Sequence, residues 1–297
     1  MLKINFYHTL IFFKLSICIS AFEYIRNNDL LIFSLFLILC IGISHGSLDN
    51  LKGKKLLKYY NINSISLFYI TYILLSLFII FSWILLPDFL LILFLLVAAY
   101  HFGKEDSDFL KNDNKKLLYI FKGSLIIIAP LIFHKNETIE VFKALNFDIS
   151  KTFLIENNFL FLILFLSLIS SLFLSFKKNF EIKCLLLMDF LSILILNFFI
   201  NPILAFTIYF CFLHSVRHSL SLIFELDKNL NKGLNKFIKK AIPLTVLTAI
   251  VYLISLFYLN RYYQVDQAIY KVIFIGLASL TFPHILLEYL VEKNERK

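Results

Sequence analysis

The chain has few of the charged residues that a soluble domain carries on its surface. Only 16% of its 297 residues are charged, whereas 60% are hydrophobic and 35 are phenylalanine. A soluble fold cannot bury so much apolar surface. The apolar runs are continuous rather than alternating, which excludes a membrane β-barrel. Several reach the length that an α-helix needs to cross a bilayer, so the sequence predicts an all-α polytopic membrane bundle of about 8–10 transmembrane helices.

Cysteine is also scarce, and its pattern excludes two classes of site. The four cysteines all lie in apolar runs, and none forms a CxxC motif: Cys18, Cys40, Cys184 and Cys211. No disulfide framework is therefore expected. The cysteines are interpreted as small core or lipid-facing residues, with no role in metal or redox chemistry.

The apolar runs define the domain organisation. The predicted spans are 30–48, 62–86, 88–106, 116–134, 159–176, 183–200, 203–224, 242–259 and 271–291. A weaker stretch, 8–22, contains Lys14 and is expected to be a retained, partly inserted helix. No internal repeat and no linker between soluble domains is evident. Residues 1–27 are therefore interpreted as an N-terminal extension, and 28–297 as a single membrane domain.

The net charge of +9 is explained by topology rather than by a nucleic-acid partner. Lysine and arginine are concentrated in alternate connections: 52–58, 104–116, 177–183, 228–240 and 293–297. Basic loops stay in the cytoplasm during insertion. The pattern predicts that these connections and the C-terminus face the cytoplasm.

Five histidines lie in or at the ends of apolar segments: His45, His101, His214, His218 and His284. Ionisable groups inside a bilayer are costly and usually face the interior of a bundle. With a rise of about 1.5 Å per residue, all five fall within one layer near or below the midplane. Because imidazole is the commonest metal ligand, the histidines are predicted to converge on one metal. His8 and His134 lie outside this layer and are not candidates.

His214 and His218 are four residues apart, which places both on one face of a helix. This spacing allows two imidazoles to bind one metal. The alternative is a polar stripe that hydrogen-bonds another helix. Arg217, between them, is expected on a different face, with its charge near the cytoplasmic interface.

Carboxylates follow two of the histidines. Asp49 comes four residues after His45, and Glu105 and Asp106 follow His101. Carboxylates at Asp49 and Asp106 could accept the second ring N–H of a histidine ligand; alternatively, they simply begin cytoplasmic loops. His284 follows Pro283, which tends to bend a helix. It is interpreted as a ligand, a supporting donor or a wall of the substrate cavity, with the last two roles favoured together.

A histidine-rich site without thiolates suits iron, copper or zinc. No convincing HExxH motif supports zinc hydrolysis, and there is no HH pair of the kind found in membrane diiron desaturases. Fe(II) with open positions suits O2 chemistry and is preferred. Tyr209, Phe210 and Phe282 could line a tunnel for a flat apolar substrate, although ordinary packing is the alternative. A different hypothesis is a histidine-lined membrane transporter or metal-binding membrane protein without oxygenase activity.

At these motifs the chain resembles the Brp/Blh-type bacterial β-carotene 15,15′-dioxygenases over roughly residues 28–292. The matching stretches are IGISHGSLD (41–49), HFGKEDSDF (101–109), FTIYFCFLHSVRH (206–218) and VFIGLASLTFPHILL (272–286). Two departures are mild and remove no ligand. Ser44 stands where the family commonly has proline, and Lys104 and Glu105 vary the HFGxxD stretch.

The resemblance implies a multi-pass, iron-dependent oxygenase of the bacterial inner membrane. It would cleave β-carotene with O2 at the central double bond to give two retinals, with β-carotene supplied by the lipid bilayer. The implied Fe(II) ligands are His45, His101, His214 and His218. His284 matches the family's PH motif but is not one of these four. By family association alone, a rhodopsin apoprotein is a plausible recipient of the retinal.

Overall fold

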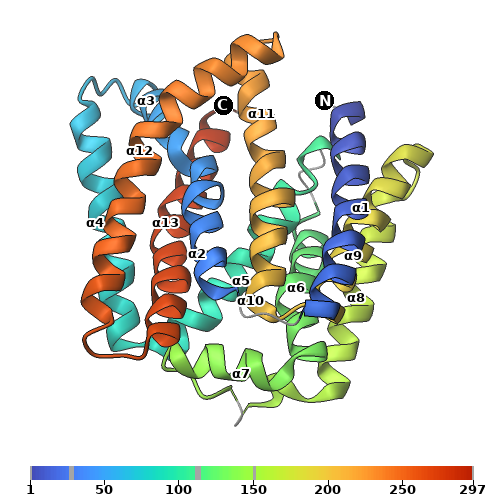
Figure 1. The fold of residues 1–297 in the computed structure, drawn as a ribbon. Coiled ribbons are helices and arrows are strands. Elements are labelled where there is room, and N and C mark those ends of the chain that lie inside the picture. The colour runs from blue at the N-terminus through green and yellow to red at the C-terminus, as the bar shows by residue number, and fades with distance from the viewer. Residues whose placement is uncertain (1, 27–29, 111–114, 150–151, 296–297) are drawn as a thin grey trace.

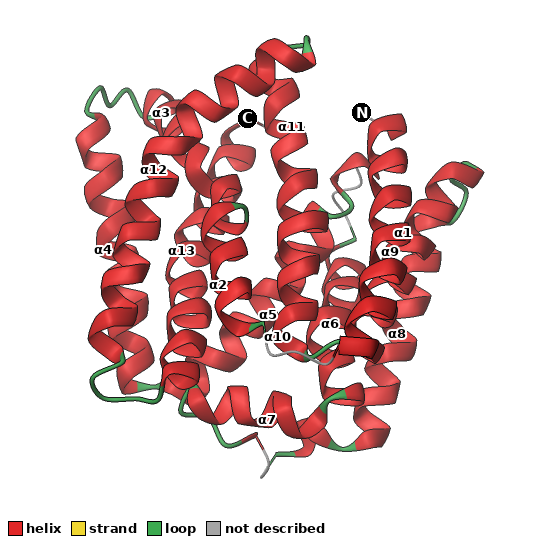
Figure 2. Cartoon of the chain, in the orientation of Figure 1, coloured by secondary structure: helices red, strands yellow, loops and turns green. Residues whose placement is uncertain are grey.

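The chain folds into a bundle of long α-helices joined by short loops (Figure 2). The structure is a computed structural model that describes residues 2–26, 30–110, 115–149 and 152–295, and no strand occurs in these ranges. Within them, ten helical stretches are long and apolar enough to cross a membrane. The prediction of an all-α polytopic membrane bundle is confirmed.

The α-helices are α1 (Leu2–Arg26), α2 (Leu31–Cys40), α3 (Asp49–Tyr59), α4 (Ile65–Leu85), α5 (Pro87–Glu105), α6 (Lys116–Phe133), α7 (Lys135–Ala144), α8 (Asn157–Ser175), α9 (Phe180–Phe199), α10 (Pro202–Ile208), α11 (Val216–Leu226), α12 (Leu230–Leu259) and α13 (Val265–Glu295). Shorter segments are η1 (Gly42–Leu48), η2 (Asp108–Leu110), η4 (Phe153–Ile155) and the π-helical η5 (Tyr209–Ser215). The long helices run side by side, and α7 lies across the lower end of the bundle (Figure 1).

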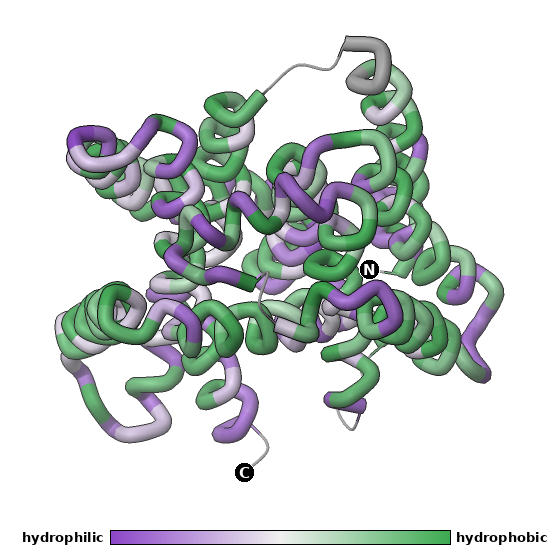
Figure 3. The backbone as a smooth tube through the Cα atoms, turned by 90° about the horizontal axis from the view of Figure 1, so that it is seen from below, coloured by the Kyte–Doolittle hydropathy of each residue, from purple (hydrophilic) through white to green (hydrophobic). Residues whose placement is uncertain are grey.

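Apolar side chains cover the outside of the bundle. Ile84 on α4 is 72% exposed and Phe257 on α12 is 68% exposed, and the chain along the outer helices is mostly hydrophobic (Figure 3). Water does not stabilise such a surface, whereas bilayer hydrocarbon does. The exterior therefore fits a protein surrounded by lipid.

Helices α5 and α6 cross with their backbones in contact, because glycine occupies both sides of the crossing. A Cβ atom on Gly103 would lie 1.8 Å from the carbonyl oxygen of Tyr119, and one on Gly123 would lie 1.9 Å from that of Ala99. No other residue allows so close an approach. The crossing fixes α5, and with it His101, in the bundle interior.

The predicted span 30–48 is not one continuous α-helix. The α-helix ends at Cys40 and the chain continues as the 3-10 segment η1. Ser44 Oγ donates to the carbonyl of Ile41 (2.7 Å), and Ser215 Oγ donates to that of Gly42 (3.1 Å). These side-chain bonds satisfy carbonyls around the break, which sequence periodicity did not reveal.

The predicted span 203–224 forms one rod made of α10, η5 and α11. Asn201 caps its start by accepting a hydrogen bond from the backbone N–H of Leu204 (2.9 Å). The central turns, at Tyr209–Ser215, are π-helical and carry His214. Such π-turns are frequent at functional sites.

Helix α1 packs against α9 and η5. His8 Nε2 donates to the carbonyl oxygen of Phe212 in the π-turn (2.8 Å), while Lys14 is exposed. Helix α1, which lies in the expected extension 1–27, thus packs against and hydrogen-bonds η5, the segment that carries His214.

Candidate metal centre

Four of the five predicted histidines come together inside the bundle. His101 on α5, His214 on η5, His218 on α11 and His284 on α13 are all buried. The ring centroids of His101 and His214 are 5.2 Å apart, those of His101 and His284 5.4 Å, and those of His218 and His284 5.9 Å. The backbone of His45 lies in η1, but its side chain is outside the described part of the structure.

Three of these imidazoles donate from Nδ1 to a carboxylate on another helix or at its end. His214 donates to Asp106 (3.0 Å), His218 to Glu105 (2.8 Å) and His284 to Asp49 (2.8 Å). With Nδ1 bonded in this way, Nε2 is the nitrogen of each ring that can ligate a metal. Metal-binding histidines are commonly oriented by carboxylates in this manner.

The structure gives the two predicted carboxylates partners that sequence spacing did not suggest. Spacing placed Asp49 beside His45 and Asp106 beside His101. In the structure, Asp49 bonds His284 and accepts from the Tyr72 hydroxyl (2.9 Å), and Asp106 bonds His214. Asp49 begins α3 and Asp106 follows the last residue of α5, and from these helix ends both carboxylates reach histidines on other helices.

Asp106 is also the acceptor for Tyr209, whose hydroxyl donates to Oδ2 (2.6 Å). Asp106 thus accepts hydrogen bonds from two buried side chains, those of His214 and Tyr209. The hydroxyl of Tyr209 thus supports the carboxylate of Asp106; its predicted role in lining a substrate tunnel stays a prediction.

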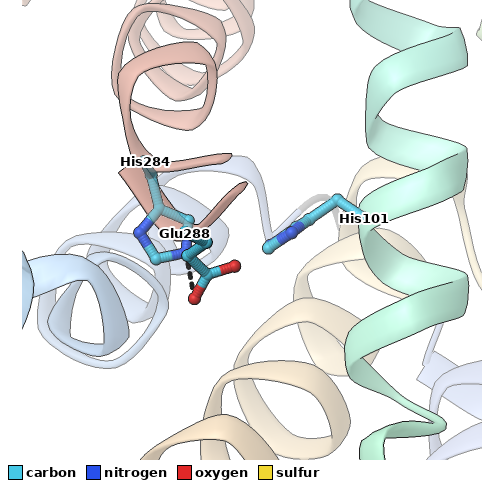
Figure 4. Close-up of side chains that lie close together, drawn as sticks. All are labelled: His101, His284 and Glu288. Carbon is cyan, nitrogen blue, oxygen red and sulfur yellow. Dashed lines mark ion pairs between the residues drawn. The ribbon is translucent and has the colours of Figure 1, made fainter. Parts of the chain in front are cut away.

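Glu288 is a residue of this cluster that sequence reasoning missed. Its Oε1 lies 3.5 Å from His284 Nε2 and 4.0 Å from His218 Nε2, and it forms an ion pair with Lys52. Donor atoms of His101, His284 and Glu288 all lie within 4.8 Å of one another (Figure 4). The available signal was its position four residues after His284, on the same helix face.

Arg217 is buried, contrary to the expectation that its charge reaches the cytoplasmic interface; only 2% of it is exposed. Its guanidinium pairs with both oxygens of Asp189 on α9 (2.8 and 2.9 Å) and donates to the carbonyl of Asp106 (2.9 Å). A further bond reaches Thr9 on α1 (2.7 Å). A partner carboxylate inside the bundle, which the sequence did not reveal, makes this burial favourable.

An apolar cavity of about 80 Å³ lies beside the cluster. Its lining includes Phe94, Ala98, Phe102, Phe142, Phe206, Phe210 and Phe274. The Phe102 and Phe210 rings also contact His214, with centroids at 4.8 and 5.8 Å. Of the three predicted lining residues, Phe210 lines this cavity. The ring of Phe282 packs against that of Phe94, which lines the cavity (centroids 6.5 Å apart).

The fold and the site together define a helical membrane protein with a buried histidine–carboxylate cluster that could hold a transition metal. The model of the family "Beta-carotene 15,15′-dioxygenase" matches residues 36–292, and the chain belongs to this family of enzymes. The β-carotene 15,15′-dioxygenase of uncultured marine bacterium 66A03 is 27% identical over 256 residues, covering 86% of this chain and 91% of that protein. No solved structure matches the chain. The family resemblance predicted from the motifs is confirmed.

Proposed function

We propose that the chain is an iron-dependent membrane dioxygenase that cleaves the central 15,15′ double bond of all-trans-β-carotene. One β-carotene and one O2 give two molecules of all-trans-retinal, with one oxygen atom in each aldehyde. The family and the name of the marine relative support this substrate and this bond. The observation that carries the proposal is the set of buried, carboxylate-bonded histidines beside an apolar cavity.

The donor set fits a ferrous ion. The family resemblance assigns the ligands to His45, His101, His214 and His218. Neutral imidazoles are suitable ligands for iron, and no thiolate lies among the described donors. Bound Fe(II) would supply the activation of O2 that protein side chains cannot provide.

The chain's own residues would position the ligands and the substrate. The carboxylates of Asp106 and Glu105 hold the Nδ1 protons of His214 and His218, which fixes the orientation of both rings. The walls of the cavity are mostly apolar and aromatic, so they would offer an unsubstituted polyene mainly dispersion contacts. Phe102 and Phe210 contact both the cavity and His214, so a polyene bound there would lie near the cluster.

The location proposed for the enzyme is the bacterial inner membrane, with its basic end in the cytoplasm. The basic helix α3, the start of α12 and the end of α13 all lie at the upper end of the bundle (Figure 1). A single membrane domain at 28–297 would receive β-carotene from the bilayer, because the substrate is insoluble in water.

The test is retinal formation by the purified, iron-loaded protein given β-carotene in detergent. Retinal should form in air, stop without O2, and carry ¹⁸O in both aldehydes when ¹⁸O2 is used, provided that exchange with water is controlled. His218→Ala should abolish cleavage in a protein that remains folded, whereas His134→Ala, at the far end of α6, should not. Folded, iron-loaded protein that forms no retinal would contradict the proposal, and undiminished cleavage by His218→Ala would contradict the site.

A further inference from the structure

We propose that α13 supplies two ligands to the metal centre, Nε2 of His284 and the carboxylate of Glu288. The bound ion would be a divalent first-row transition metal. This inference rests on the metal-dependent function proposed above and extends it, because neither residue belongs to the four-histidine set that the family resemblance implies. The centre would then combine imidazoles with one carboxylate and, because O2 chemistry at Fe(II) requires an open position, would use no more than five protein ligands in all.

The first observation is the spacing between donor atoms. Glu288 Oε1 is 3.5 Å from His284 Nε2 and 4.0 Å from His218 Nε2. The longer separation exceeds a hydrogen bond and the shorter is at its limit. Two ligands bound to one ion at about 2.0–2.2 Å are separated by about 3 to 4 Å. Both distances therefore suit shared coordination better than direct hydrogen bonding.

The second observation is the orientation of His284. Its Nδ1 donates to both carboxylate oxygens of Asp49 (2.8 and 2.9 Å), and Asp49 is itself held by the hydroxyl of Tyr72 (2.9 Å). His218 has the equivalent arrangement, with Nδ1 on Glu105. The same carboxylate–histidine geometry that marks His218 as a ligand thus applies to His284.

The third observation is the placement of Glu288. It lies one helical turn after His284, so both side chains project from the same face of α13 toward His101 (Figure 4). Glu288 is buried, and burial of a carboxylate requires a compensating cation. Lys52 supplies one such charge; a divalent ion among the imidazoles would supply a second.

The competing explanation is that Glu288 serves only as the counter-charge of Lys52. The two explanations predict different effects on metal binding. A ligand contributes to affinity and to the ligand field of the ion, whereas a counter-charge contributes mainly to stability.

The experiment is titration of the metal-free protein in detergent with Co(II), followed by its visible d–d absorption and by competition with a chelator. Glu288→Gln and His284→Ala should each weaken Co(II) binding by more than about 100-fold, because altering residues behind a ligand already costs about 10–100-fold. Both should also change the d–d spectrum. The matched control is Glu292→Gln, one turn further along α13, where the carboxylate pairs with Lys104.

The variant Lys52→Met distinguishes the two explanations for Glu288, that of a metal ligand and that of a counter-charge for Lys52. If Glu288 is a ligand, Lys52→Met should leave the wild-type d–d spectrum, whereas Glu288→Gln should not. Wild-type affinity and spectrum in folded Glu288→Gln or His284→Ala would overturn the inference. These readouts do not depend on turnover: absence of retinal with intact Co(II) binding counts against the proposed function, while wild-type protein that binds no Co(II) would overturn both proposals.

Discussion

Replacing Arg217 by methionine should destabilise the bundle strongly. The guanidinium makes two bonds to Asp189 (2.8 and 2.9 Å), one to the Asp106 carbonyl (2.9 Å) and one to Thr9 (2.7 Å). The unbranched methionine side chain occupies much of the same space but has no hydrogen-bond donor and no charge. The carboxylate of Asp189 would then be buried without its cation.

Removing one partner of a buried ion pair costs about 3–5 kcal/mol of unfolding free energy. Arg217 and Asp189 are each only 2% exposed, so solvent screening reduces this value little. We therefore expect a loss of about 3–5 kcal/mol for Arg217→Met. The double variant Arg217→Met/Asp189→Leu leaves no buried charge of this pair and should lose less than the two single losses added, by at least about 2 kcal/mol.

The assay is unfolding in mixed micelles by SDS titration, followed by circular dichroism. Arg261→Met is the control, because Arg261 is exposed near the end of α12 and should change stability by less than about 0.5 kcal/mol. A loss below about 1 kcal/mol for Arg217→Met, or strictly additive losses in the double variant, would refute the reasoning.

Three further predictions concern the site and its supports. Asp106→Asn should lower metal affinity about 10–100-fold by weakening the orientation of His214; metal content after chelator dialysis checks this, and unchanged content would contradict it. Gly123→Ala should lower the unfolding free energy by about 1–3 kcal/mol in the SDS assay, because its Cβ would lie 1.9 Å from the Ala99 carbonyl oxygen. Gly46→Ala is the control, because a Cβ there meets no described atom within 4 Å. Equal stabilities of the two variants would contradict the close contact between α5 and α6. Ala98→Phe should narrow the apolar cavity and raise the KM for β-carotene several-fold without loss of metal; unchanged KM would place the substrate elsewhere.

The sequence was sufficient to predict that histidines meet near one layer of the bundle. His101, His214, His218 and His284 all have depths that follow from helix rise and span direction. The depth of a residue in the membrane depends only on its position within its own helix, so it can be predicted from the sequence. The side chain of His45 lies outside the described residues, so its place in the cluster stays a prediction.

The partners of those histidines could not be predicted in the same way. Asp49 and His284 are separated by 235 positions, and Asp106 and His214 by 108. Which carboxylate reaches which ring depends on the neighbours and rotation of each helix, and neither follows from periodicity. The same limit explains why Arg217 was wrongly expected near the interface and why the bond from Tyr209 was not foreseen, because their partners Asp189 and Asp106 belong to other segments.

The sequence by itself determined the membrane bundle, its apolar spans and the layer of buried histidines, because hydrocarbon solvation and helix rise act on each segment alone. Only the tertiary structure decided that η1 interrupts the first strongly apolar span, that carboxylates from other segments hold the rings, and that Glu288 joins them. Those features depend on contacts between helix faces far apart in the chain. They become fixed only when close-packed crossings, such as Gly103 against Tyr119, set how the helices meet.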